Sequence, residues 1–280
     1  MIGFIGSVFS PWYRWAGRKN PDNHCCINTV TYGPGGRWTM TERGTEALSA
    51  TPDRLQVGPS AMVWERDGLT VEVDETTTPH LGRMKGRIRF EPDALTEIEA
   101  TLHPKGSHIW RPFAPSGRIE VDLGERGGRW RGHGYLDANF GTAALEDDFR
   151  YWSWGRFPVK DGAVTFYDAL RRDGVRSSLA LRFDGRGRAE EIAPPPTARL
   201  PRSLWTVKRE TRADAGFRPR QRLMMLEAPF YNRAAIETKI FGETSVGVYE
   251  ALDLDRFASP LIKPMLAVRV PRRRRWRPAS

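Results

Sequence analysis

Short strand-like segments separated by turn residues recur along most of this chain, and they constrain its fold more than any other feature. The segments Ala61–Arg66 and Leu69–Val73, for example, flank Asp67-Gly68, a dipeptide typical of tight hairpins. The predicted strands are Cys26–Tyr32, Arg37–Arg43, Ala61–Arg66, Leu69–Val73, Arg83–Phe90, Glu97–Leu102, Gly117–Leu123, Arg129–Asp137, Ala163–Leu170, Ser177–Phe183, Glu190–Ile192, Ser203–Glu210, Gln221–Leu226, Ala235–Phe241 and Ser245–Tyr249. Helix is expected only as short pieces at Ala143–Tyr151 and Asp253–Phe257. This pattern predicts an all-β fold of antiparallel barrels or sandwiches.

The length of 280 residues allows one large domain or two of ordinary size. The two series of strands favour two β-domains, residues 1–158 and 159–270, joined near residues 155–162. Residues 271–280 are expected to form an arginine-rich tail.

Positive charge is concentrated at the C-terminus. The formal net charge is +10, and six of the arginines lie in the last dozen residues: Arg269, Arg272, Arg273, Arg274, Arg275 and Arg277. Such a tail suits anionic lipid headgroups or nucleic acid, and a solvated end with no partner is the remaining alternative.

The only two cysteines, Cys25 and Cys26, are adjacent and cannot supply a disulfide framework or a spaced metal site. A reducing, cytoplasmic compartment is the simplest interpretation. The N-terminal apolar run stops at Ser10-Pro11, too short to span a bilayer. The aromatic residues around Trp12 either rest at a membrane interface or form a buried first strand and turn.

Polar and aromatic residues recur two apart in two other segments, and residues two apart in a strand face the same side. They are His108 and Trp110 in the first segment, and His133, Tyr135, Asp137 and Asn139 in the second. Trp110 could simply pack in a barrel mouth while His108 caps a loop. An aspartate aligned with large aromatic residues is costly to bury without a partner, so Asp137 favours a functional pocket.

Other kinds of site lack support in the sequence. The chain has no Gly-x-Gly-x-x-Gly motif between a strand and a helix, no Walker loop and no Gly-x-Ser-x-Gly elbow. The scattered histidines lack the close spacing of a zinc site, so we expect no metal.

Several strings resemble the carotenoid 1,2-hydratases, also called hydroxyneurosporene synthases, from residue 3 to about 272. These strings are Gly6-Ser7-Val8-Phe9-Ser10-Pro11-Trp12-Tyr13, Asn23-His24-Cys25, Tyr32-Gly33-Pro34, Trp38-Thr39-Met40-Thr41-Glu42-Arg43-Gly44, His133-Gly134-Tyr135-Leu136-Asp137-Ala138-Asn139-Phe140-Gly141 and Leu252-Asp253-Leu254-Asp255-Arg256-Phe257. Tyr249 stands where the family is expected to have a histidine.

The resemblance implies a tandem of two lipocalin-like β-domains. It also implies hydration of the terminal C1=C2 bond of acyclic carotenoids, such as neurosporene or lycopene, without a cofactor. The family's implicated His-x-Trp and Tyr-x-Asp pairs fall on His108, Trp110, Tyr135 and Asp137. Substrate and water are then the small-molecule partners, at the cytoplasmic side of the photosynthetic membrane, with the arginine-rich tail touching anionic lipid.

The chemistry assigns each of these residues a role. Asp137 is expected to protonate the alkene, Trp110 and Tyr135 to stabilise the carbocation, and His108 to take a proton from water. His133, Asn139 and Phe140 are candidate substrate-binding residues. A lipocalin-like carrier that leaves its ligand unaltered is the alternative, and nucleic-acid binding through the tail is not favoured.

Overall fold

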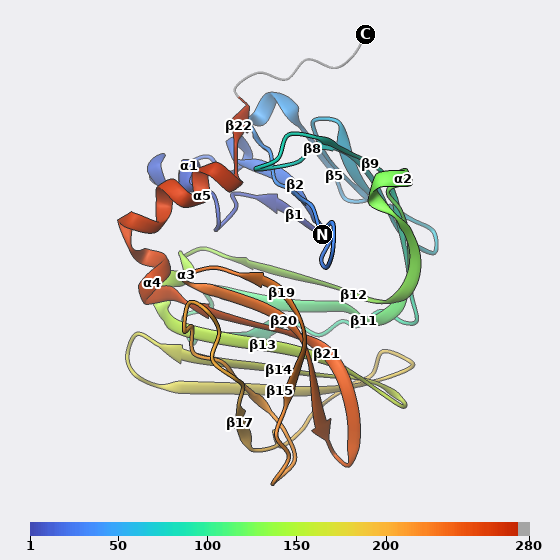
Figure 1. Cartoon of the computed structure of the whole chain (residues 1–280), viewed down its shortest axis with the longest axis vertical. Coiled ribbons are helices and arrows are strands. Elements are labelled where there is room, and N and C mark those ends of the chain that lie inside the picture. The colour runs from blue at the N-terminus through green and yellow to red at the C-terminus, as the bar shows by residue number, and fades with distance from the viewer. Residues whose placement is uncertain (274–280) are drawn as a thin grey trace. The chain divides into compact units, whose positions relative to one another are not determined.

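The computed structural model describes residues 1–273, without the side chain of residue 126, and it comprises two compact units. Unit 1 contains Met1–Pro92, Gly117–Gly134 and Pro260–Ser280, and unit 2 contains Asp93–Ser116 and Tyr135–Ser259. Antiparallel strands dominate both units and the helices are short, which confirms the predicted all-β class (Figure 1).

Unit 1 is built on an antiparallel meander of consecutive strands. These strands are β5 (Leu48–Thr51), β6 (Arg54–Val57), β7 (Ser60–Glu65), β8 (Gly68–Thr76) and β9 (Arg83–Pro92). β9 also pairs with the second half of β11 (His108–Asp122), where Gly117 lies opposite Pro92 and Asp122 lies opposite Arg87. The two-residue turn Arg66-Asp67 before Gly68 joins β7 to β8, as the Asp-Gly signal predicts.

A smaller sheet of unit 1 joins strands from the first residues of the chain to residues 272–273. It contains β1 (Ile2–Ile5), β2 (Cys25–Val30), β3 (Trp38–Thr39), β4 (Glu42–Arg43) and β22 (Arg272–Arg273). The helical pieces of unit 1 are α1 (Pro11–Trp15), η1 (Pro21–Asn23), η2 (Thr45–Ala47), α2 (Gly124–Gly127), η3 (Pro260–Ile262) and α5 (Lys263–Arg269). The N-terminus is therefore a strand followed by a short helix. No helix among residues 1–273 has the length and hydropathy needed to cross a bilayer.

The adjacent cysteines face opposite sides of β2 because side chains alternate along a strand. Cys25 packs with Ile27 and Val57, whereas Cys26 packs with Met40 and Val270. Both thiols are buried and free. The buried Val270 thus attaches the C-terminal segment to the core of unit 1.

The first residues of the predicted tail belong to this sheet. β22 pairs in parallel with β4, and Arg272 forms an ion pair with the buried carboxylate of Glu42. Arg272 also donates to Asn23 O at 2.9 Å. The remaining arginines of the tail, within residues 274–280, lie outside the described part of the chain.

Unit 2 is built on a seven-stranded antiparallel sheet with strand order β16-β15-β14-β13-β21-β20-β19. In chain order, its strands are β13 (Phe149–Val159), β14 (Gly162–Arg171), β15 (Arg176–Asp184), β16 (Ala189–Glu191), β19 (Arg220–Glu227), β20 (Tyr231–Ile240) and β21 (Glu243–Asp253). The other elements with residues in unit 2 are β10 (Ala100–Thr101), the ends of β11 and β12 (Arg129–Gly141), α3 (Leu145–Asp148), β17 (Thr197–Arg199), β18 (Glu210–Arg212) and α4 (Leu254–Ala258).

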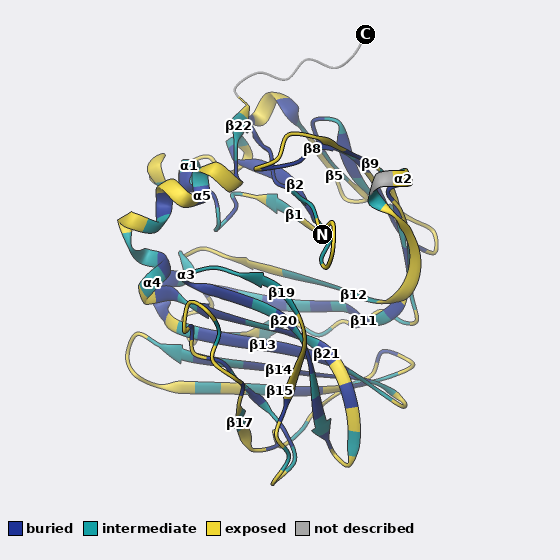
Figure 2. Cartoon of the chain, in the orientation of Figure 1, coloured by how far each residue is buried: buried dark blue, intermediate teal, exposed yellow. Residues whose placement is uncertain are grey.

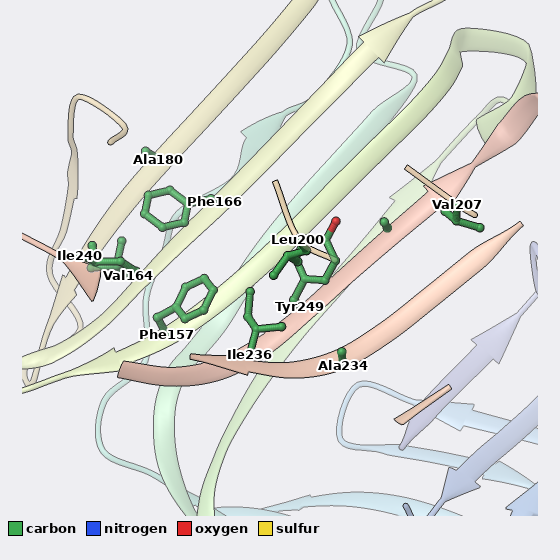
Figure 3. Packing of buried hydrophobic residues seen from close by; sticks show 11 residues of the cluster. Phe157, Val164, Phe166, Ala180, Leu200, Val207, Ala234, Ile236, Ile240 and Tyr249 are labelled. Carbon is green, nitrogen blue, oxygen red and sulfur yellow. The ribbon is translucent and has the colours of Figure 1, made fainter. Parts of the chain in front are cut away.

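The two faces of this sheet have different contents. One face carries a buried hydrophobic cluster that includes Phe157, Phe166, Ile236 and Tyr249, and Leu200 packs with it from the segment after β17 (Figure 3). Directly paired residues share a face, so the alternate residues of the same strands point to the other side. That other side carries the candidate site described below.

Three secondary-structure predictions are wrong. Of the strand predicted at Glu97–Leu102, only the two residues of β10 (Ala100–Thr101) form a strand. Ser203–Glu210 is irregular until Glu210, because Thr206 adopts a φ of 54° that breaks an extended backbone. The predicted helix Ala143–Tyr151 is confined to α3, and the chain becomes strand β13 at Phe149, which pairs with β14. The predicted helix at Asp253–Phe257 is confirmed as α4: Asp253 accepts a hydrogen bond from Arg256 N at 3.0 Å as its N-cap.

Residues 155–162, where the sequence predicts a join between domains, form the hairpin of β13 and β14 within unit 2. The compact units are discontinuous in sequence, whereas the predicted domains 1–158 and 159–270 are continuous. The predicted tandem of two lipocalin-like domains stays a prediction.

Candidate active site

Asp137 and Trp110 contact each other across neighbouring strands in unit 2. The indole Nε1 of Trp110 on β11 donates to Asp137 Oδ2 on β12 at 2.9 Å. Trp110 is 1% exposed, and Asp137 is partly exposed. The structure therefore brings into contact one residue from each of the two segments in which polar and aromatic residues recur two apart.

The surroundings of Asp137 favour its protonated form. Although part of the side chain reaches solvent, burial raises the pKa of Asp137 to about 6, and the carboxylate of Glu250 adds to that rise. The hydrogen bond from Trp110 and the charge of Arg233 lower the pKa but do not cancel the loss of solvation. At pH 7, roughly one-tenth of the Asp137 carboxyl groups are then protonated.

Aromatic rings from β13 and β14 surround this pair. The rings of Trp110 and Tyr167 are 5.9 Å apart, and those of Trp152 and Tyr167 are 5.7 Å apart. Tyr135 lies 5.1 Å from Trp154 at an interplanar angle of 36°. These side chains meet because Trp154 is paired with Tyr167 in the sheet, and Trp152 lies two residues away on the same face.

Two buried indole groups near the site have N–H donors to offer. Nε1 of Trp152 and Nε1 of Trp154 are buried and have no hydrogen-bond partner within residues 1–273. A buried donor without a partner is costly. Each is therefore a candidate donor to a water molecule or to the oxygen of a ligand.

Charged residues of the neighbouring strands β21 and β20 lie beside Trp154 on the same face of the sheet. Glu250 on β21 is opposite Trp154, and Arg233 on β20 is opposite Glu250. Arg233 Nη1 and Glu250 Oε1 form an ion pair at 2.9 Å. The pair places one carboxylate and one guanidinium close enough to Asp137 to act on its pKa in opposite directions.

Tyr135 also lies beside a cation. The guanidinium of Arg156 is 5.7 Å from the centroid of the Tyr135 ring, and Arg156 Nε donates to Pro115 O at 2.8 Å. Burial raises the pKa of Tyr135, while the Arg233 and Arg156 charges lower it without reversing the shift. The phenol is therefore neutral at physiological pH.

His108 belongs to a second polar cluster, centred on Asp148. His108 Nε2 lies 3.0 Å from Asp148 Oδ2, and Ser107 Oγ donates to the same oxygen at 2.7 Å. Burial lowers the pKa of His108, although the Asp148 carboxylate partly opposes this. A neutral His108 that donates from Nε2 to Asp148 keeps a lone pair on Nδ1.

The free nitrogen of His108 faces β12. A Cβ added at Gly141 would collide with Ser107 O and lie 3.2 Å from His108 Nδ1. Gly141 and Asp137 are four residues apart on β12, so they lie on the same face of that strand. Because His108 and Trp110 are two residues apart on β11, their Cα atoms lie roughly 7 Å apart and their side chains leave the same face of the strand.

The same Asp148 contacts two further residues. His103 Nε2 and Lys105 Nζ each lie 3.8 Å from Asp148 Oδ1. Burial raises the pKa of Asp148, but hydrogen bonds from Ser107 and His108, with the charge of His103, outweigh it and lower the pKa overall. Asp148 is therefore a carboxylate, whereas Asp137 is partly a carboxylic acid.

The three predicted substrate-binding residues are all exposed side chains of β12. His133 is exposed and belongs to unit 1. Asn139 is exposed. Phe140 is 49% exposed and, three residues from Asp137, lies on the opposite face of β12. Their predicted role in substrate binding stays a prediction.

The sequence interpretation missed several residues of the site. Trp152, Trp154 and Arg156 recur two apart in β13. The alternation was therefore present, but it lies between the expected helix Ala143–Tyr151 and the expected domain join at residues 155–162, where no strand was predicted. No local signal identifies Glu250 or Arg233, because only the strand pairing of β20 and β21 with β13 brings them close.

Tyr249, which replaces an expected histidine, lies in the hydrophobic cluster on the other face of the sheet. Its hydroxyl accepts a hydrogen bond from Glu210 N at 3.0 Å. It therefore binds the β17–β18 segment to the sheet. Within residues 1–273, no three His, Cys, Asp or Glu side chains are grouped as metal ligands.

Comparison with known proteins adds an independent line of observation. Residues 1–279 match the family model described as "Carotenoid hydratase CrtC". A protein of Cereibacter sphaeroides named acyclic carotenoid 1,2-hydratase is 64% identical, over 99% of each chain. Proteins of the same name are 55% identical in Rhodobacter capsulatus, over 99% of each chain, and 48% identical in Thiocapsa roseopersicina, over 97% of this chain and 68% of that one. A solved structure titled "Crystal structure of CghA with Sch210972" has a TM-score of 0.44 at 11% identity, covering 82% of this chain and 83% of that chain.

Proposed function

Because this chain belongs to the carotenoid hydratase CrtC family and is a hydro-lyase, we propose that it hydrates the terminal C1=C2 double bond of acyclic carotenoids such as neurosporene or lycopene. The product would be a tertiary 1-hydroxy carotenoid. One observation carries the mechanism. Asp137, with a pKa raised to about 6, accepts a hydrogen bond from Trp110 among aromatic rings.

The first step is protonation of carbon. Asp137 transfers its proton to C2 of the alkene, whose π electrons form the new C–H bond and leave a tertiary cation at C1. An ordinary aspartic acid, with a pKa of about 3.9, is almost fully ionised at neutral pH and cannot act in this way. The raised pKa of Asp137 supports the role.

The second requirement is stabilisation of the cation. The faces of Trp110 and Tyr135 were expected to supply it, and Tyr167 and Trp154 add further rings. Each ring that faces the cation would contribute about 0.5–2 kcal/mol. The carboxylate left on Asp137 adds electrostatic attraction.

The third step is capture by water. The water oxygen forms a bond to C1 and releases a proton to His108 Nδ1, the nitrogen that Asp148 leaves unprotonated. An unpartnered indole N–H, that of Trp154 or Trp152, could donate to the water oxygen and hold it. Proton exchange with solvent then restores neutral His108 and protonated Asp137.

We propose that no cofactor takes part. Adding water to an alkene neither oxidises nor reduces the substrate overall, and each step moves one proton between groups of the chain and the substrate. Acid, base and aromatic surfaces are therefore sufficient for this chemistry.

The proposed location is the cytoplasmic side of the photosynthetic membrane, because acyclic carotenoids dissolve in lipid. The arginines within residues 274–280 are proposed to attract anionic headgroups. A variant that ends after Arg273 tests this contact without disturbing the Arg272–Glu42 ion pair.

The direct test is product analysis after incubation of the purified protein with lycopene or neurosporene in detergent. Mass spectrometry should find the mass of one added water per hydrated end, and deuterium should appear at C2 in heavy water. Recovery of unaltered pigment bound to the protein would instead support the carrier function.

A further inference from the structure

An exposed apolar surface of unit 1 is not used by the proposed chemistry. It consists of Trp15 at the end of α1, Leu261 in η3, and Met265 and Val268 in α5, which we call the apolar helix surface. Their exposed fractions are 55% for Trp15, 85% for Leu261, 39% for Met265 and 62% for Val268. Along α5, exposed stretches alternate with buried and intermediate ones (Figure 2). Large apolar side chains grouped in this way mark a surface that binds something.

The spacing of these residues puts them on one side of the helix. Leu261, Met265 and Val268 are separated by four and three residues, the spacing of neighbours on a helical face. The opposite side of α5 is buried through Lys263 and Leu266. The helix therefore packs through its other side, and the stripe of Leu261, Met265 and Val268 faces solvent.

The surface is held in place by hydrogen bonds to the C-terminal end of α5. α1 packs against α5, and Trp12 Nε1 donates to Val270 O at 2.6 Å. The ring of Trp15 contacts that of Trp12 at 5.2 Å, which places Trp15 beside the same helix pair. Trp38 Nε1 also donates to Arg269 O at 3.0 Å. Hydrogen bonds and helix packing thus fix the apolar helix surface to the rest of unit 1.

Charge identifies the kind of partner. Residues 1–21 and 256–280, which supply both helices, contain no aspartate or glutamate. Exposed Lys19 follows α1, and exposed Arg269 ends α5. The charged residues within these two segments are thus all cations, and the nearest carboxylates in the sequence are those of Asp22 and Asp255, just beyond them. Such segments match an anionic lipid surface, where apolar groups enter the boundary of the acyl chains and cations contact headgroups.

We propose that the apolar helix surface docks unit 1 onto an anionic lipid bilayer. The inference is supported by, but does not require, the proposed function, since a hydratase of carotenoids must take its substrate from lipid. It assigns the docking to α1, η3 and α5, in addition to any contact made by residues 274–280.

The test measures co-sedimentation of the full chain with vesicles. Phosphatidylcholine vesicles that contain phosphatidylglycerol are compared with vesicles of phosphatidylcholine alone. The double variant Leu261→Ser, Val268→Ser should weaken binding to the anionic vesicles about tenfold or more. Leu81→Ser is the matched control, because Leu81 is 86% exposed in the same unit, and it should bind like wild type.

Charge reversal gives a second measurement. Lys19→Glu with Arg269→Glu should weaken binding to the anionic vesicles and leave the weak binding to phosphatidylcholine nearly unchanged. Circular dichroism melts show whether each variant is folded. Wild-type binding by both folded double variants would overturn the proposal.

Two other outcomes would also overturn it. If a chain that ends after Arg273 loses all vesicle binding, residues 274–280 are the membrane contact. If the wild type is a dimer in sedimentation velocity and the Leu261→Ser, Val268→Ser variant is a monomer, the surface binds a second copy of the chain. Failure of hydration in detergent would leave these binding results intact, so it would count against the proposed function alone.

Discussion

The indole Nε1 of Trp110 donates a hydrogen bond of 2.9 Å to Oδ2 of Asp137. This bond stabilises the ionised carboxylate, and yet burial raises the pKa of Asp137 to about 6. The proposed acid is thus balanced between two opposing influences. One holds the carboxyl in position, and the other keeps a useful fraction of it protonated.

Activity should depend on pH through Asp137. In the proposed mechanism the protonated form is the active one, so kcat/KM for lycopene should rise as the pH falls through about 6. Asp137→Asn should reduce hydration at least about a hundredfold at every pH and retain pigment binding. Near-wild-type turnover by this variant would remove Asp137 as the proton donor.

The same shift predicts an effect on stability. The folded pKa of Asp137 is raised to about 6 from an ordinary value of 3.8, so the folded state binds the proton more tightly than the unfolded state. The contribution of this group to the free energy of unfolding therefore falls as the pH rises from about 4 to about 6. Asp137→Asn should raise Tm relative to wild type at pH 8, and this gain should shrink towards pH 4. An equal difference in Tm at both pH values would contradict the assignment.

Trp110 has two separable properties, its ring and its N–H donor. Trp110→Phe should retain more activity than Trp110→Ala, because the phenyl ring still faces the cation. Trp110→Phe also removes the donor to Asp137, so the midpoint of its pH profile should move upward. Equal activity losses in the two variants would argue against stabilisation of the cation by the ring.

Glu250 should act on the reaction through Asp137. Its carboxylate raises the pKa of Asp137, and Glu250→Gln also leaves the charge of Arg233 less compensated. The pH profile of the variant should move to lower pH, with activity at pH 7 reduced about threefold to tenfold. Glu243→Gln, at the start of the same strand, is the control and should keep the wild-type midpoint. An unchanged midpoint for Glu250→Gln would show that the ion pair is only structural.

Asp148 should position His108 rather than donate the initial proton. Asp148→Asn should lower kcat about tenfold to a hundredfold, because the imidazole loses the carboxylate that holds its Nε2 proton. Asp147→Asn is a close control, since Asp147 is the exposed neighbour of buried Asp148. The pKa of His108, followed by NMR, should fall in the Asp148 variant. Equal kcat losses in the Asp147 and Asp148 variants would contradict this role.

Local patterns determined much of this protein. The turn dipeptides and β-branched segments predicted antiparallel strands because backbone geometry and side-chain alternation act over a few residues. The same alternation singled out His108, Trp110, Tyr135 and Asp137, and the structure places Trp110 against Asp137. The strand at Phe149–Val159 was missed because its aromatic residues follow a short acidic helix and no glycine or proline separates the two.

Only the tertiary structure decided which partners these residues have. His108 meets Asp148, 40 positions later, and the row from Trp154 through Glu250 to Arg233 exists because β13, β21 and β20 pair in register. The pKa of Asp137 depends on this assembly, since desolvation and charge act through space and not along the chain. The sequence by itself determined most of the strands and the residue types of the site. The packing of distant strands decided that burial raises the pKa of Asp137, whereas hydrogen bonds from Ser107 and His108 lower that of Asp148.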